Sequence, residues 1–151
     1  MLGGEEIYSL DNKGRVSIPL IIRKAIQPED MTSFTVIRGM NKCINAYPQY
    51  EWVKYQEKIN KLNLFDEQNL LFLRAFLRYK QDLILDEQYR IVLPKKLIEH
   101  ANIQNKALIL GVNDHIEFWN PEIFDEYMNE LEKDIPYEKV AALVMGNKNN
   151  E

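Results

Sequence analysis

The amino-acid sequence contains an internal repeat that constrains the fold more than any other feature. Residues 11–19 read DNKGRVSIP and residues 86–94 read DEQYRIVLP, so Asp, Arg and Pro each recur after 75 positions. Residues 35–47 align in the same way with residues 107–119, at an offset of 72. A unit too small to bury its own core usually packs against its copy. The sequence therefore predicts an α+β fold in which two ββαββα units share one pseudo-twofold core.

The elements expected within the first copy follow from its turn residues and prolines. We expect residues 6–10 and 15–18 to pair as a hairpin across the turn at 11–14, because Asn and Gly tolerate the positive φ that such a turn requires. A short helix should begin at Pro19 and run to about residue 25. The remaining expected elements are strands at 33–38, 43–47, 82–85, 90–93, 107–110 and 115–119, and helices at 49–61, 66–79, 95–101, 121–133 and 138–145.

These elements suggest four segments. Residues 1–48 form the first unit, and residues 49–80 form a helical linker with Trp52 and Phe76 among its regularly spaced apolar residues. Residues 81–120 form the second unit. Residues 121–151 are expected to form acidic C-terminal helices and a frayed polar tail.

The charge is distributed unevenly along the chain. The net charge is −4, but residues 120–151 contain eight acidic and three basic side chains. The remainder, residues 1–119, has sixteen basic and fifteen acidic side chains and is close to neutral. Attraction to phosphate depends on the local field rather than on the net charge, so a cationic face on the repeats remains compatible with this composition.

Composition and motifs argue against several classes of function. No apolar run approaches the length of a membrane span, and the N-terminus lacks the pattern of a signal peptide, so we expect a cytoplasmic protein without membrane contact. A single cysteine, Cys43, excludes an intramolecular disulfide. Cys43, His100 and His115 fit no catalytic or zinc-binding spacing. We therefore predict no enzyme activity, no small-molecule substrate, no cofactor and no metal.

Arg15 and Arg90 are the candidate functional residues, because each follows an Asp by four positions across a turn. Asp11 and Asp86 could brace these guanidinium groups while the arginines reach a phosphate or a guanine edge. The alternative is an ordinary surface ion pair contributing well under about 1 kcal/mol. Because the Asp–Arg pair recurs in both copies, the two interpretations are equally supported. Lys13 adds a positive charge in the first turn. Further cations nearby are Arg23, Lys24, Arg38, Lys42, Lys95 and Lys96; Arg74, Arg78 and Lys80 are more typical of a solvated helix face.

The repeated motif resembles a known family. Residues 11–19, Arg38 and Gly39, residues 86–94 and residues 116–119 are similar to those of the MraZ family, and the resemblance extends from Met1 to about residue 143. Members are double AbrB-like, swapped-hairpin transcription regulators of the bacterial division and cell-wall gene cluster. The resemblance implies a β-barrel-like pseudo-dimer core, with linker and terminal helices packed around it. It also implies ring-shaped homo-oligomers that bind repeated promoter boxes in double-stranded DNA and associate with the nucleoid. Arg15 and Arg90 would contact DNA, with Asp11 and Asp86 as their motif partners.

Two residues of the second motif depart from the family pattern. Tyr89 stands where Gly is usual, and Gln88 where a second charge is common. Tyr adopts a positive φ less readily than Gly, so the second loop is expected to have either another shape or another contact role. An alternative to DNA binding is an antitoxin-type interaction module whose acidic C-terminal segment binds a basic partner.

Overall fold

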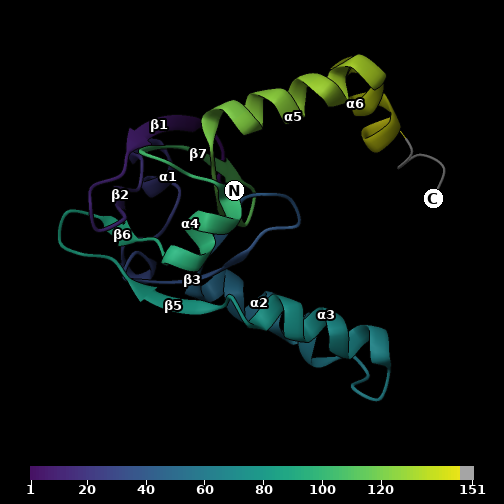
Figure 1. Cartoon of the computed structure of the whole chain (residues 1–151), viewed down its shortest axis with the longest axis horizontal. Coiled ribbons are helices and arrows are strands. Elements are labelled where there is room, and N and C mark those ends of the chain that lie inside the picture. The colour runs from purple at the N-terminus through teal and green to yellow at the C-terminus, as the bar shows by residue number, and fades with distance from the viewer. Residues whose placement is uncertain (147–151) are drawn as a thin grey trace. The chain divides into compact units, whose positions relative to one another are not determined.

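A computed structural model describes residues 1–146, which divide into a unit of residues 1–120 and a separate unit that begins at Pro121 (Figure 1). The α+β class is confirmed. The elements of the first unit are, in chain order, β1 (Glu5–Ser9), β2 (Arg15–Ser17), α1 (Leu20–Arg23), the 3₁₀ turn η1 (Pro28–Asp30), β3 (Ser33–Arg38), β4 (Ile44–Pro48), α2 (Gln49–Asn60), α3 (Glu67–Leu77), β5 (Gln81–Ile84), β6 (Arg90–Val92), α4 (Lys95–Ala101), β7 (Lys106–Val112) and β8 (His115–Trp119). These bounds lie close to the expected ones, and the two copies contribute elements in the same order.

The strands of one copy pair with strands of the other. A six-stranded antiparallel sheet has the order β1-β7-β8-β4-β3-β5, so β1 lies beside β7, β8 beside β4, and β5 beside β3. The short strands β2 and β6 form a separate antiparallel ribbon, at the left of the view in Figure 1. Neither copy therefore completes its own sheet.

The expected hairpin between residues 6–10 and 15–18 is wrong. β1 pairs with β7 and β2 pairs with β6, although the turn itself forms, since the Gly14 N–H donates to the Asp11 carbonyl at 3.0 Å. Pairing across the copies places Val16 opposite Ile91, and both side chains are buried in the shared core. Burying an aliphatic side chain of this size contributes about 1.5–3 kcal/mol, so cross-copy pairing is preferred.

The main core is built from equivalent residues of the two copies. Val16 and Ile91, Ile18 and Leu93, and Ile22 and Leu97 are related by the same 75-residue displacement, and all six are almost fully buried in one cluster. Phe34, Ile109 and Phe118 from the large sheet join them. Each copy supplies only part of this cluster, which explains why the two fold together.

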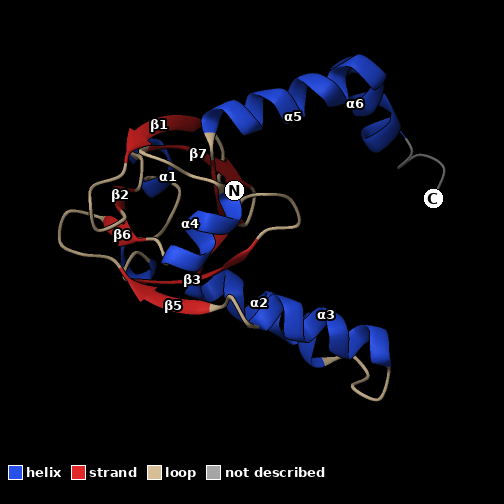
Figure 2. Ribbon diagram, viewed as in Figure 1, coloured by secondary structure: helices blue, strands red, loops and turns tan. Residues whose placement is uncertain are grey.

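The two linker helices, α2 and α3, pack on each other and on the sheet (Figure 2). Trp52 of α2 and Phe76 of α3 stack with ring centroids 6.2 Å apart, and both join Ile37 and Tyr47 in a second buried cluster. Asp66 caps α3 by accepting hydrogen bonds from two backbone N–H groups. The helical spacing of apolar residues predicted these helices correctly.

The second unit consists of α5 (Pro121–Asp134) and α6 (Tyr137–Gly146), with Pro136 between them. Both helices were expected near these positions. The predicted frayed tail falls mostly on residues 147–151, which lie outside the described residues. Within residues 1–146, no helix combines the length and the apolar character that crossing a membrane requires.

Candidate nucleic-acid interface

The β2–β6 ribbon places Arg15 and Arg90 on one face. Its register sets Arg15 opposite Val92, Val16 opposite Ile91, and Ser17 opposite Arg90. Successive side chains of a strand point to opposite faces, and directly paired residues share a face. Val16 and Ile91 are 1% and 0% exposed, so they define the inner face. The two arginines consequently belong to the outer face of the ribbon, related by the pseudo-twofold axis that passes between Val16 and Ile91.

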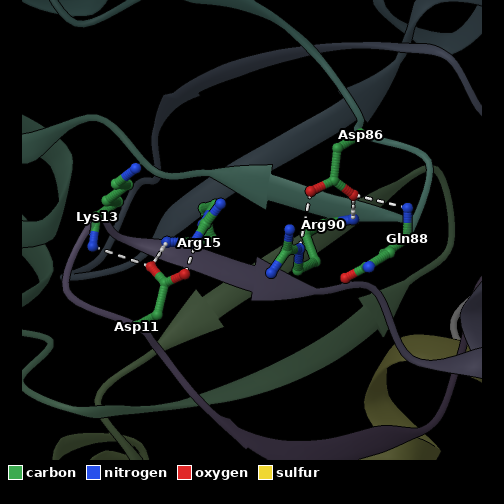
Figure 3. Close-up of polar contacts among 6 residues, drawn as sticks. All are labelled: Asp11, Lys13, Arg15, Asp86, Gln88 and Arg90. Atoms are coloured by element: carbon green, nitrogen blue, oxygen red, sulfur yellow. Dashed lines mark hydrogen bonds and ion pairs between the residues drawn. The ribbon is translucent and has the colours of Figure 1, made fainter.

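The first turn holds Arg15 through Asp11. One carboxylate oxygen, Oδ1, accepts hydrogen bonds from the backbone N–H groups of Lys13 and Arg15, both at 2.9 Å. The other oxygen, Oδ2, accepts from the Arg15 Nε (Figure 3). Asp11 therefore fixes the turn and the direction of the guanidinium at once.

The second turn repeats this arrangement with Asp86. Its Oδ1 accepts from the backbone N–H groups of Gln88 and Arg90 at 2.8 and 2.9 Å, and its Oδ2 accepts from the Arg90 Nε at 2.7 Å (Figure 3). The arginine side chains are similarly exposed, at 32% for Arg15 and 29% for Arg90. Both copies of the motif thus present a braced, partly exposed guanidinium.

These contacts also set the charge state of the two aspartates. The backbone hydrogen bond from Arg15 is the largest influence on Asp11, and with the Arg15 side chain it lowers the pKa of the carboxyl despite partial desolvation. The pKa of Asp86 is lowered in the same way, first by the backbone N–H of Arg90. Both carboxylates remain ionised at neutral pH, so each offsets one arginine charge while leaving the terminal guanidinium nitrogens available as donors.

Tyr89 adopts the turn conformation of Gly14. The φ angles are +58° at Tyr89 and +78° at Gly14, both left-handed, and the surrounding hydrogen bonds match. The expectation of a different shape for the second loop is therefore wrong. The guanidinium of Arg23 lies 4.3 Å from the centre of the Tyr89 ring, a stacking contact that offsets part of the strain. The other expectation, a different contact role, stays a prediction.

The ribbon and the two turns that precede its strands contain both arginines and the three residues named with them in the sequence, which are Asp11, Lys13 and Asp86. Lys13 and Gln88 occupy equivalent positions in the two turns, at opposite ends of the row of side chains in Figure 3. Ser17 and Val92 also belong to the outer face, although the sequence analysis did not single them out. Side chains two positions apart on a strand share a face, so the positions of Arg15 and Arg90 predict that Ser17 and Val92 lie on the outer face.

The other basic residues are not brought to the ribbon as a group. Arg38 lies over the Tyr79 ring, 5.0 Å from its centre. A groove that includes no residue of β2 or β6 is lined in part by Arg78, Lys80, Lys95 and Lys96. Lys80 is paired there with Asp82 at 3.3 Å.

Cys43, His100 and His115 lie in three different surroundings. Cys43 is 2% exposed, and burial raises the pKa of its thiol to about 12. The His100 Nε2 hydrogen-bonds with the Asn41 carbonyl, whereas His115 lies between Asp114 and Glu117. Among residues 1–146, no group of three or more His, Cys, Asp or Glu side chains has an arrangement that could hold a metal ion.

Comparison with known proteins gives a consistent family assignment. A family model described as "MraZ protein, putative antitoxin-like" matches residues 1–75 and again residues 76–145. A protein of Natranaerobius thermophilus named transcriptional regulator MraZ is 37% identical over 145 residues, covering 96% of this chain and 97% of its own length. Proteins of the same name from Pediococcus pentosaceus and Syntrophobacter fumaroxidans are 35% and 34% identical, covering 88% and 95% of this chain and 90% and 93% of their own lengths.

Proposed function

The chain belongs to the MraZ family, and on that premise we propose that it is a sequence-specific DNA-binding transcriptional regulator. Its relatives are named as transcriptional regulators and not as enzymes. The DNA it binds would be repeated boxes in the promoter of the bacterial division and cell-wall gene cluster. Such a protein works in the cytoplasm, in association with the nucleoid.

The observation that carries the proposal is the pair of aspartate-braced arginines on the outer face of the β2–β6 ribbon. A guanidinium held by a carboxylate loses little further conformational entropy when it meets DNA. Its free N–H donors can bind a phosphate or the O6 and N7 atoms of guanine. Arg15 and Arg90 are the proposed contacts, Asp11 and Asp86 position them, and Lys13 adds charge at one end.

The cross-copy pairing of β1 with β7 and of β2 with β6 supports the swapped-hairpin interpretation of the core. A fold of this kind presents two related turns from one chain, as a symmetric dimer would. We expect the four sequence segments to act as two interlocked repeats, a helical linker and an acidic terminal segment.

Homo-oligomerisation into a ring would complete the binding surface. One subunit offers few cations, and the chain as a whole is acidic. Several subunits held together meet several boxes at high effective concentration, which raises the affinity without new contacts. This explains how a protein of net charge −4 can bind DNA.

Substitution of Arg15 by Ala tests the site. The Arg15→Ala protein should bind promoter DNA more weakly. If the guanidinium contacts a phosphate, the slope of log affinity against log salt should also become shallower by about 1 for each bound subunit; if it contacts a guanine edge, the slope should be retained. Lys58→Ala is the matched control, since it removes one exposed charge from α2. Equal binding by the parent and Arg15→Ala at matched salt, with the same oligomeric state, would show that the site assignment is wrong.

The description "antitoxin-like" favours one alternative, in which the acidic C-terminal segment binds a basic protein. Neutralising Asp125, Glu126 and Glu132 of α5 separates the two functions. Loss of a captured protein with DNA binding retained would support the partner model. Unchanged capture and unchanged DNA binding would exclude the acidic segment from both.

A further inference from the structure

A groove at one end of the β2–β6 ribbon is lined by Tyr8, Ser9, Ser17, Ile18, Arg23 and Gln88. Two of these residues also belong to the candidate interface. Ser17 is paired with Arg90 on the outer face, and Gln88 lies in the second turn, at the end of the row shown in Figure 3 that is remote from Lys13. The groove therefore adjoins the surface that carries the two braced arginines.

Arg23 is held in this groove by two contacts. Its guanidinium carbon lies 4.3 Å from the centre of the Tyr89 ring, and its Nε donates to the Ile18 carbonyl at 3.0 Å. No carboxylate pairs with Arg23 in the described part of the chain, in contrast to Arg15 and Arg90. Its full positive charge and the N–H donors of its terminal nitrogens remain for a ligand. Because the side chain is already fixed, binding a ligand costs it little conformational entropy.

The equivalent end of the ribbon lacks this chemistry. The 75-residue displacement relates Ser9 to Ile84, Ser17 to Val92 and Arg23 to Ile98. Ile84 and Val92 are 81% and 47% exposed. The hydroxyl and guanidinium donors of the groove therefore do not follow from the repeat, since the other copy carries aliphatic residues at these places.

We propose that this groove binds a phosphate of the DNA backbone, with Arg23 as the charged donor and the Ser9 and Ser17 hydroxyls as neutral donors. This inference rests on the proposed function. A phosphate is an acceptor with two oxygens that a planar guanidinium can engage together. Tyr89 acts as a positioning residue, because its ring supports the guanidinium. The contact exists at one end only, so each subunit binds DNA with a defined polarity.

The test is a salt titration of binding to promoter DNA and to shuffled DNA of the same length. Arg23→Gln should weaken binding to both DNAs by a similar factor and make the slope of log affinity against log salt shallower by about 1 for each bound subunit. Lys24→Gln removes the same charge from the next residue, outside the groove, and should leave the slope close to that of the parent. Arg23→Lys should retain the slope.

A second variant covers the case in which Arg23→Gln fails to fold. Ser17→Val places on β2 the residue that β6 carries at the equivalent position, so it suits the strand. It should weaken binding to both DNAs without changing the slope, because a neutral donor is lost.

Each outcome separates this inference from the proposed function. An unchanged slope and affinity for Arg23→Gln, together with weaker binding by Arg15→Ala, would overturn the phosphate site while the regulator function stands. Weaker binding to promoter DNA alone, with the slope retained, would assign Arg23 to a base edge and overturn the phosphate assignment. A parent protein that binds neither DNA would overturn the proposed function itself.

Discussion

At the scale of single residues, Gly14 and Tyr89 have the same left-handed backbone conformation with very different surroundings. A Cβ added to Gly14 would lie 3.2 Å from the Leu93 carbonyl oxygen and 3.3 Å from the Ile98 side chain. Tyr89 has Arg23 at the position equivalent to Ile98, and the two side chains stack. The left-handed conformation could not be inferred for Tyr89 from its residue type, because the compensating contact comes from the other copy.

Gly14→Ala should destabilise the protein by about 1–2 kcal/mol, since alanine is strained at a positive φ and its Cβ meets the Leu93 carbonyl. Tyr89→Gly should change stability by less than about 1 kcal/mol, because relief of strain opposes the lost stacking with Arg23. Urea unfolding of both variants measures the difference. Equal effects of the two substitutions would contradict this account of the turns.

Cys43 should be chemically inert in the folded protein. The thiolate is the reactive form, and burial raises the pKa of this thiol to about 12 while excluding reagents from it. An aromatic disulfide reagent at neutral pH should label it only as the protein unfolds in urea. Labelling of the native protein at the rate of a small free thiol would show that the site opens readily.

At the scale of secondary-structure elements, the sequence predicts well where helices and strands lie along the chain, but it predicts poorly which strands pair. The strand at 33–38 and the helix at 95–101 occur where turn residues, prolines and apolar spacing place them. The pairing of β1 and β2 was not predictable in this way, because a tight turn normally implies a hairpin. Here the buried contact of Val16 with Ile91 decides the pairing, and it joins residues 75 positions apart. Local signals contain no information about such a distant partner.

A titratable cluster lies at the start of β8, formed by His115 and Glu117 of the strand and by Asp114 just before it. His115 hydrogen-bonds with Asp114 at 2.8 Å and with Glu117 at 2.9 Å. Burial acts to lower the pKa of His115, but the contacts with Glu117 and Asp114 together outweigh burial and raise it above 6.5. Burial likewise opposes ionisation of Glu117, yet hydrogen bonds from His115 and Trp119 lower its pKa overall. The cluster therefore favours a charged histidine in the folded protein.

Stability should consequently fall as the pH rises above 6.5 through the raised pKa of His115. A group whose pKa is higher in the folded than in the unfolded state stabilises the folded protein fully at pH values below its unfolded pKa. This contribution decreases as the pH rises and is lost once the pH has passed the folded pKa. Urea unfolding at a series of pH values from about 5.5 to 8.5 measures this, with His115→Gln as the variant that should lose this component. A parallel pH dependence in the parent and in His115→Gln would contradict it.

At the scale of the whole molecule, the sequence predicts that each arginine has an aspartate partner, but it does not predict that the two arginines share one surface. The motif spacing identifies Asp11 with Arg15 and Asp86 with Arg90, and both contacts are present. Their common outer face depends on the β2–β6 register, and the groove around Arg23 depends on residues from three separate stretches of the chain. Only the folded arrangement of both copies brings these groups together.

Binding should depend strongly on the number of boxes in the DNA. If subunits assemble into a ring, a fragment with several boxes should bind about 100-fold or more tightly than a fragment with one, because later contacts are intramolecular. Gel-shift titration of the two fragments measures this ratio, and mass photometry of the same sample gives the oligomeric state. A ratio equal to the number of boxes would indicate independent subunits.

The joining of both copies in one chain has a consequence for how the ribbon can diversify. In a dimer of identical chains, every substitution appears on both sides of the twofold axis, so a change that improves one end alters the other equally. Here Arg23 and Ile98 are encoded separately, as are Ser17 and Val92. One end of the ribbon can accordingly become polar and the other apolar, while Val16 and Ile91 remain paired in the core between them. A fused repeat can thus distinguish the two directions along a DNA duplex, which a strictly symmetric dimer cannot.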